Sequence, residues 1–262
     1  MKVLLFGASG MVGQGVLREC LLDSNVASVV IVVRKPTGRK HEKLTELVHP
    51  DLATLASLEG QLTGFDACFF CAGVSVLGMT EEQYTRVTYD LTLGVAKTLL
   101  RTSPDLTFVY VSGAGTDSSE KGRRMWARVK GRTENALLSM PFRAAYMFRP
   151  GLIMPLHGIR SSTRWYNVAY AAIRPIYPLL RRVAPTMITT TEQLGRAMIA
   201  VARNGYSTHV LEMADINRLG TWTPSSTAKL SRSWYPDETS ASYARTPVTQ
   251  TAASAPQSHF SR

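Results

Sequence analysis

The first fifteen residues constrain the fold most, because an apolar run passes directly into three evenly spaced glycines. Residues 2–6 are KVLLF, Gly7, Gly10 and Gly13 follow, and residues 15–22 carry apolar side chains at helical spacing. A buried strand, a glycine-rich turn and a helix in this order form the unit that cradles the diphosphate of a dinucleotide. The alternative is an ordinary glycine-rich turn between a strand and a helix, with no ligand.

Each glycine has an expected role in such a unit, although the spacing is GxxGxxG rather than GxGxxG. Gly7 would allow the sharp turn and Gly13 the tight packing of the helix on the strand. Gly10 would let a pyrophosphate approach the amides and the positive dipole end of the helix. The residues expected to contact the diphosphate are Gly7, Ser9, Gly10, Met11, Val12 and Gly13.

A second strand is expected at residues 28–33, SVVIVV, whose continuous β-branched run is typical of a buried parallel strand. This strand ends in Arg34 and Lys35, about twenty residues after the glycines, where the adenosine ribose of a dinucleotide lies. An acid at this place would bind a ribose 2′-hydroxyl, whereas two cations suit a 2′-phosphate. The pattern therefore favours NADP(H) over NAD(H), with solvated charges at a strand end as the alternative.

Strands and helices then alternate along the chain, which predicts a Rossmann-type α/β fold with a doubly wound, mainly parallel sheet. Thr80 and Gln83 have capping-box spacing at the start of the longest helix. The apolar positions of that helix recur at fours and are expected to face the sheet: Val87, Leu91, Val95 and Leu99. The further strands are expected at residues 44–49, 67–71, 106–111 and 143–148, and the helices at 53–59, 80–101 and 124–139.

The pattern changes after residue 151. Residues 152–190 are expected to form a small cap region near the C-terminal end of the fold. Within it, residues 160–182 carry five arginines and no acid, interleaved with aromatic residues. A cap over the substrate cleft is favoured for this segment, and a membrane-surface element is the alternative. A helix at 191–202 and a strand at 208–213 complete a dinucleotide-binding domain of residues 1–216.

Residues 217–262 are expected to form a disordered tail. From residue 221 onward, sixteen of 42 residues are Ser or Thr, and few are aliphatic. Such a composition buries too little apolar surface to offset the entropy lost on ordering the chain.

Charge, cysteines and apolar runs limit the class of protein further. The formal net charge of +11 favours anionic ligands, but the sequence holds no recognisable nucleic-acid module. Cys20, Cys68 and Cys71 are too few and wrongly spaced for a metal site, so core packing is predicted for them and no metal is expected. The sequence shows neither a signal-peptide pattern nor an apolar run long enough to span a membrane. These features predict a soluble, cytoplasmic protein.

Four ordered motifs resemble those of the atypical or extended short-chain dehydrogenases/reductases. They are the glycine loop, residues 109–114 (VYVSGA), Lys130 within residues 129–134 (VKGRTE), and residues 148–151 (FRPG). The chain is most similar to the NAD(P)-dependent epimerase/dehydratase-like branch that includes the Tat-interacting oxidoreductase. The resemblance covers about residues 1–216.

This resemblance implies roles for several residues. Ser112 matches the serine that polarises a substrate carbonyl, and Lys130 matches the lysine that binds the nicotinamide ribose. Trp126 stands where the family has its proton-transferring tyrosine, and an indole cannot exchange a proton near neutral pH. The remaining cofactor-binding matches are Asp51 at the adenine, the adjacent Leu52, Gly73 in the cofactor channel and Pro150 beside the nicotinamide.

Three functions remain open at this point. The first is an NADP(H)-dependent oxidoreductase or epimerase, with NAD as the alternative cofactor, acting on a small carbonyl or hydroxyl compound. The second, motivated by Trp126, is a non-catalytic protein that binds the cofactor and reports its state to a partner. The third is a peripheral membrane or nucleic-acid binder that uses residues 160–182. The first is preferred, with no nucleic acid as partner, and the sequence does not indicate an oligomeric state.

Overall fold

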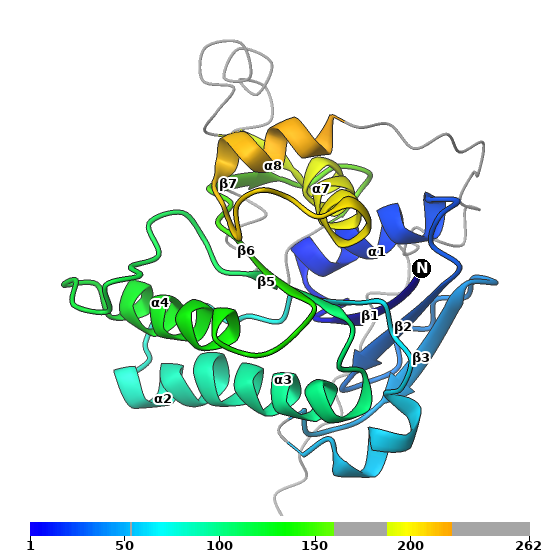
Figure 1. Cartoon of the computed structure of the whole chain (residues 1–262), viewed down its shortest axis with the longest axis horizontal. Coiled ribbons are helices and arrows are strands. Elements are labelled where there is room, and N and C mark those ends of the chain that lie inside the picture. Colours follow the sequence, from blue (N-terminus) through cyan, green and yellow to red (C-terminus); the bar gives the residue numbers. More distant parts are fainter. Residues whose placement is uncertain (53, 160–187, 222–262) are drawn as a thin grey trace, which may run out of the picture.

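The computed structural model describes residues 1–52, 54–159 and 188–221, and at their centre lies a parallel sheet of seven strands (Figure 1). Its strand order is β3-β2-β1-β4-β5-β6-β9, and every neighbouring pair is parallel. The predicted doubly wound α/β fold is therefore confirmed. The strands of this sheet are β1 (Lys2–Phe6), β2 (Ser28–Val33), β3 (Leu44–Val48), β4 (Ala67–Phe70), β5 (Thr107–Val111), β6 (Ala144–Phe148) and β9 (Val210–Leu211).

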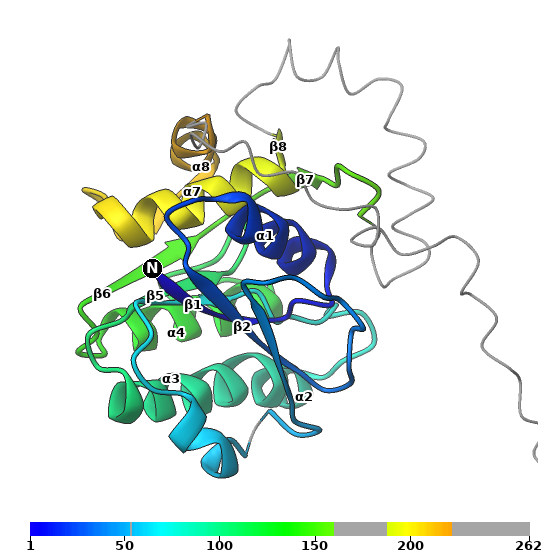
Figure 2. The ribbon, with the colours of Figure 1, turned by 90° about the vertical axis from the view of Figure 1, so that its right-hand side faces the viewer.

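Helices cover both faces of the sheet, as Figures 1 and 2 show from two directions. One face carries α1 (Met11–Leu22), α7 (Thr191–Asn204) and α8 (Met213–Gly220), and α1 and α7 pack against each other. The other face carries α2 (Glu81–Thr85), α3 (Leu91–Thr102) and α4 (Met125–Leu138). Each face has its own apolar core, because alternate side chains of the strands point to opposite sides.

The strand order reverses direction at β1, whose neighbours are β2 on one side and β4 on the other. In open α/β sheets, ligands bind beyond the carboxyl ends of the strands at such a reversal. The glycine loop follows β1 directly, so the fold places the loop at the binding crevice expected for this architecture.

The long helix after residue 80 begins as predicted, with a capping box in which Thr80 and Gln83 bond each other's backbone. Between α2 and α3, however, a turn of π-helix, η2 (Arg86–Asp90), interrupts the α-helical register. The wider turn rotates the side chains that follow, so Thr88 is buried and Val87 is 36% exposed. The expectation that Val87 faces the sheet is therefore wrong.

Two other elements differ from expectation. The helix expected at 53–59 is a 3₁₀ segment, η1 (Ala56–Gln61). The strand expected at 208–213 is limited to β9, because Glu212 caps α8 through a reciprocal pair of bonds with Asp215. Helix α8 then continues to Gly220, beyond the domain end expected at residue 216.

The region expected to form a cap contains a small two-stranded parallel sheet, β7 (Leu152–Met154) with β8 (Ile188–Thr190). The basic, aromatic segment predicted at 160–182 and the tail after residue 221 lie outside the described residues. Cys20 and Cys68 are buried in the core and Cys71 is half-buried. Among the residues that the structure describes, none of the helices has the length and apolarity to cross a membrane.

Candidate functional site

Two of the three glycines of the loop, Gly7 and Gly13, have backbone contacts too close for a Cβ. Gly7 has a φ of +81°, and a Cβ there would lie 2.5 Å from the backbone nitrogen of Ala72 after β4. A Cβ on Gly13 would lie 2.1 Å from the carbonyl oxygen of Gly7. Real Cβ atoms do not approach backbone this closely, so the turn and the first turn of α1 both depend on glycine.

The N-terminus of α1 carries no side chain that competes with an anion. Its N-cap is Gly10, which makes no side-chain capping bond, and the first turn contains no acidic residue. The first amides of a helix lack partners within the helix, and together with the helix dipole they favour a bound anion. The loop residues therefore fit a diphosphate group.

The other positions predicted to bind the cofactor follow different strands, and all lie beyond the carboxyl edge of the same parallel sheet. Arg34 and Lys35 follow β2 and are exposed, whereas Pro150 follows β6 and is buried, its carbonyl accepting a 2.8 Å bond from the Ala114 amide. Gly73 follows β4, and a Cβ there would meet nothing within 4 Å. After β3, Asp51 is exposed and Leu52 packs against the apolar core under α3.

The structure brings Ser112 and Lys130 together. Ser112 follows β5, and the Lys130 ammonium on α4 donates to its backbone carbonyl oxygen. The Ser112 hydroxyl points into the protein, where it donates to the buried carboxylate of Glu134 and lies 3.1 Å from the Phe148 carbonyl. In this arrangement Ser112 can accept a hydrogen bond from a substrate, whereas donation to a carbonyl requires its hydroxyl to turn away from Glu134. Its role in catalysis stays a prediction.

Several groups in this site have a pKa that differs from the ordinary value. Among them, Lys130 has the pKa nearest neutrality. Burial lowers the pKa of Lys130 from 10.5 to about 8, because the charged ammonium loses hydration. The carboxylate of Glu134, one helical turn further along α4, opposes this shift by stabilising the cation.

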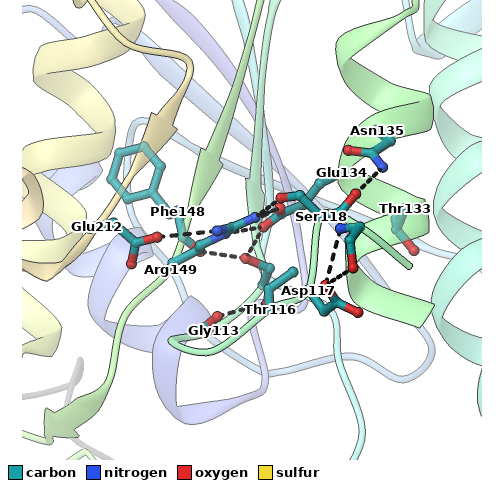
Figure 3. A network of polar contacts seen from close by, with 12 residues as sticks. Gly113, Thr116, Asp117, Ser118, Thr133, Glu134, Asn135, Phe148, Arg149 and Glu212 are labelled. Atoms are coloured by element: carbon teal, nitrogen blue, oxygen red, sulfur yellow. Dashed lines mark hydrogen bonds and ion pairs between the residues drawn. The ribbon is translucent and has the colours of Figure 1, made fainter. Parts of the chain in front are cut away.

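A network of polar contacts centred on Arg149 includes Glu134, the carboxylate that accepts the Ser112 hydroxyl (Figure 3). The guanidinium forms an ion pair with Glu134, with Nε 3.1 and 3.2 Å from the two carboxylate oxygens. It also donates to the hydroxyl of Ser118 and, over 3.2 Å, to Glu212 before α8. Arg149 thus connects α4, β6, the β5–α4 loop and the start of α8.

The sequence pattern assigned no role to either Glu134 or Arg149. Both occur inside motifs that carry the family resemblance, VKGRTE and FRPG. Their available signals are the i+4 spacing of Glu134 from Lys130 and the position of Arg149 directly before Pro150. Neither signal identifies an ion pair between residues 15 positions apart, which only the folded sheet brings together.

Trp126 lies one turn before Lys130 on α4 and is half-buried. It faces the loop that follows β5, where a Cβ on Gly115 would be 3.7 Å from the indole ring. Tyr84 and Tyr110 do not replace the missing tyrosine. Both are buried, and burial raises the pKa of each phenol. Tyr166, in the segment expected to form the cap, lies outside the described residues.

Comparison with known proteins gives the family. The model of the NAD dependent epimerase/dehydratase family matches residues 3–123. Protein fmp52, mitochondrial, from Aspergillus clavatus is 31% identical over 180 residues, which cover 66% of this chain and 73% of that protein. The namesake from Emericella nidulans is 30% identical over 58% of this chain, and the match spans 66% of its length. Leucinostatins biosynthesis cluster protein T from Purpureocillium lilacinum is 25% identical over 76% of this chain and 83% of its own.

Solved structures share the fold. ADP-L-glycero-D-manno-heptose-6-epimerase from Helicobacter pylori superposes with a TM-score of 0.58 at 15% identity, covering 82% of this chain and 79% of its own. UDP-glucuronic acid 4-epimerase from Bacillus cereus, in complex with NAD, gives a TM-score of 0.57 at 14% identity. The match covers 80% of this chain and 76% of that epimerase. Identities this low establish the architecture alone.

The relatives also correct one expectation. Several carry the name "mitochondrial", including those from Emericella nidulans, Aspergillus niger and Aspergillus oryzae, so the prediction of a cytoplasmic protein is wrong. The glycine loop at the strand-order reversal, the parallel sheet and the matched relatives agree on one assignment. The chain belongs to the family of the Fmp52 proteins, and its residues 3–123 match the model of the NAD dependent epimerase/dehydratase family.

Proposed function

We propose that this protein binds NADP(H) and acts as an oxidoreductase or epimerase-like enzyme on a small carbonyl or hydroxyl compound. The observation that carries the proposal is the uncapped N-terminus of α1, packed through Gly7 and Gly13 at the reversal of strand order. The epimerase from Bacillus cereus has the same fold and is in complex with NAD, which supports a nicotinamide dinucleotide here. The cations Arg34 and Lys35 after β2 support NADP(H) over NAD(H).

When bound, the nicotinamide supplies hydride chemistry, and the chain provides binding and orientation. The glycine loop and the first amides of α1 hold the diphosphate. Lys130, anchored on the Ser112 carbonyl, is placed to bind the nicotinamide ribose. Pro150, fixed by its bond from the Ala114 amide, would lie beside the nicotinamide. The glycine loop follows β1, Ser112 follows β5 and Pro150 follows β6, all at the carboxyl edge of the sheet. Lys130 on α4 joins them through its bond to Ser112.

Proton transfer needs a group other than the indole of Trp126. Lys130 has a pKa of about 8, which suits proton exchange near neutral pH. We assign the proton-transfer role to Lys130, with Ser112 accepting a hydrogen bond from a substrate hydroxyl.

The first experiment measures the melting temperature of the protein with NADPH and with NADH. A ligand at about 100 times its dissociation constant stabilises the fold by roughly 2.7 kcal/mol, which gives a clear shift. We expect the larger shift with NADPH. Loss of NADPH absorbance is then followed with a panel of small aldehydes, ketones and keto sugars. A protein that binds neither dinucleotide contradicts the proposal.

A second candidate function is a non-catalytic sensor of the cofactor, and Trp126 is the observation that favours it. Tight binding of NADPH without turnover of any substrate in the panel would support the sensor. Turnover that Lys130→Met abolishes while NADPH binding persists would support the enzyme.

The names of the Fmp52 relatives support a mitochondrial location for this chain. Cell fractionation with an antibody against the protein tests this part of the proposal. We expect the protein to sediment with a mitochondrial matrix or membrane marker, and recovery with other compartments alone would contradict it.

A further inference from the structure

The connection between β2 and β3 folds back onto the glycine loop through a chain of side-chain bonds. Arg39 Nη2 donates to the Gln14 side-chain carbonyl on α1 over 3.1 Å, although the two residues are 25 positions apart. Gln14 Nε2 in turn donates to the carbonyl of Ser9 within the glycine loop over 2.9 Å. The guanidinium is thereby held between the end of β2 and the expected diphosphate cradle.

The backbone of this connection is anchored to β3. The Thr37 amide donates to a carboxylate oxygen of Glu46 over 3.1 Å, and the Thr37 hydroxyl donates to the other oxygen. The Arg39 amide donates to that same hydroxyl over 3.3 Å. Both ends of Arg39 are therefore fixed, its backbone by Thr37 and its guanidinium by Gln14.

Arg39 differs from the cations that the sequence pattern singles out. Arg34 and Lys35 are exposed, whereas Arg39 is half-buried. Burial lowers the pKa of Arg39 and Glu46 raises it, and a guanidinium remains charged under both influences. A partly dehydrated, oriented guanidinium binds a phosphate more strongly and more selectively than a flexible surface cation, because its planar fork matches two oxygens.

The space between the end of the second strand and the glycine loop is where the adenosine ribose of a dinucleotide lies in this architecture. Residues 34–40, RKPTGRK, contain no acid that could bind a ribose 2′-hydroxyl. We propose that Arg39 is the specificity-determining residue for NADP(H), binding the 2′-phosphate while Gln14 orients its guanidinium. This inference rests on the proposed function, and it moves the determinant from the exposed end of β2 to a residue five positions later.

The test measures dissociation constants of NADPH and NADH by calorimetry for the full-length protein and three variants. Arg39→Met removes the cation and keeps an aliphatic side chain. Arg39→Lys keeps the charge but loses the fork. Lys40→Met removes a cation from the exposed neighbouring residue and serves as the matched control.

Hydrogen bonds to charged groups contribute about 1.5–3 kcal/mol, which corresponds to roughly 10- to 150-fold in affinity. We therefore expect Arg39→Met to weaken NADPH binding by at least about tenfold. Its NADH dissociation constant should stay within about twofold of the wild-type value, since NADH has no 2′-phosphate. Arg39→Lys should fall between wild type and Arg39→Met, and Lys40→Met should retain the wild-type preference.

The outcomes separate the two proposals. Equal weakening of NADPH and NADH in Arg39→Met would show a structural role for Arg39 and overturn the inference while leaving dinucleotide binding intact. A wild-type protein that binds NADH as tightly as NADPH overturns it as well. Binding of neither dinucleotide overturns the proposed function together with the inference.

A measurement on the wild-type protein alone covers the case in which Arg39→Met fails to fold. Adenosine 2′,5′-bisphosphate and 5′-ADP are used as probes, because they carry the adenosine half of the cofactor with and without the 2′-phosphate. The inference predicts at least about tenfold tighter binding of the 2′,5′-bisphosphate, with the difference falling as salt screens the charges. Equal binding of the two probes overturns it.

Discussion

Glu134 and Arg149 form an ion pair behind the candidate site, and the carboxylate of Glu134 is 0% exposed. The pair joins the middle of α4 to the end of β6, and Glu134 also accepts the hydroxyl bond of Ser112. The same carboxylate acts electrostatically on Lys130. The buried carboxylate of Glu134 therefore connects the packing of α4 and β6 to Ser112 and Lys130, the two residues proposed to act on the substrate.

Breaking this pair should destabilise the fold strongly. Arg149→Met would leave the Glu134 carboxylate buried without its cation, and removal of one partner of a buried pair costs about 3–5 kcal/mol. Glu134→Gln keeps a polar group of the same shape and should cost less. Urea unfolding measures the free energy of unfolding of each variant.

The control for this prediction is Arg86→Met, which removes an exposed partner of Glu82 on the π-helical turn. Exposed pairs add little to stability, so this variant should unfold close to the wild-type midpoint. Equal loss of stability in Arg86→Met and Arg149→Met would contradict the structural importance of the buried pair.

Lys130 should titrate near pH 8. Reductive ¹³C-methylation of lysines followed by NMR measures this pKa, and the signal that is missing from Lys130→Arg assigns the resonance. In Glu134→Gln the pKa of Lys130 should fall further, because the carboxylate that raises it is gone. A titration midpoint near the ordinary lysine value would contradict the burial of this ammonium.

Because the pKa of Lys130 is lowered in the folded protein, the direction in which stability changes with pH can be predicted. The folded-state pKa of Lys130 is about 8 against 10.5 for the free group, so the unfolded chain binds more protons between these values. Stability relative to Lys130→Met should therefore increase from about pH 8 to pH 10.5. A constant difference across this window would show that Lys130 is not perturbed.

Gly13→Ala should both destabilise the protein and weaken dinucleotide binding. A Cβ at this position would lie 2.1 Å from the Gly7 carbonyl, so α1 must shift away from the turn. Such overpacking costs typically about 1–3 kcal/mol. Thermal unfolding and NADPH calorimetry measure the two effects.

Gly94→Ala is the matched control, because a Cβ at this helical position in α3 meets nothing within 4 Å. Alanine favours a helix over glycine by roughly 0.8–1 kcal/mol, so this variant should be slightly more stable and bind NADPH unchanged. A harmless Gly13→Ala would contradict the tight packing of the loop.

The sequence predicts the fold well because its determining signals are local. The β-branched run of β2, the glycines after β1 and the capping box at Thr80 each identify their element from neighbouring residues. The error at Val87 arises because a single π-helical turn changes the helical period, which an apolar pattern of regular spacing does not reveal.

The candidate site is predictable only where a motif carries it. The glycine loop, Ser112 and Lys130 can be located from their sequence context. The Arg149 network and the Arg39–Gln14 bond join residues 15 and 25 positions apart through the folded chain, with no periodic or compositional signal. The sequence pattern also does not predict which way a side chain points. The hydroxyl of Ser112, which points inward to Glu134, is an example.

Trp126→Tyr tests whether the missing phenol limits catalysis. A phenol at this position would lie one helical turn from the Lys130 ammonium, whose charge favours the ionised form of the tyrosine. General acid–base catalysis contributes about 10²–10⁴-fold, so turnover should rise, with a factor of this order as the upper bound because Lys130 already transfers the proton. Trp126→Phe supplies an aromatic ring without a hydroxyl and should show no gain. Rates of NADPH oxidation with the carbonyl panel measure all three proteins. If Trp126→Tyr and Trp126→Phe are equally active, the proton enters from another group, and Lys130 remains the residue placed to supply it.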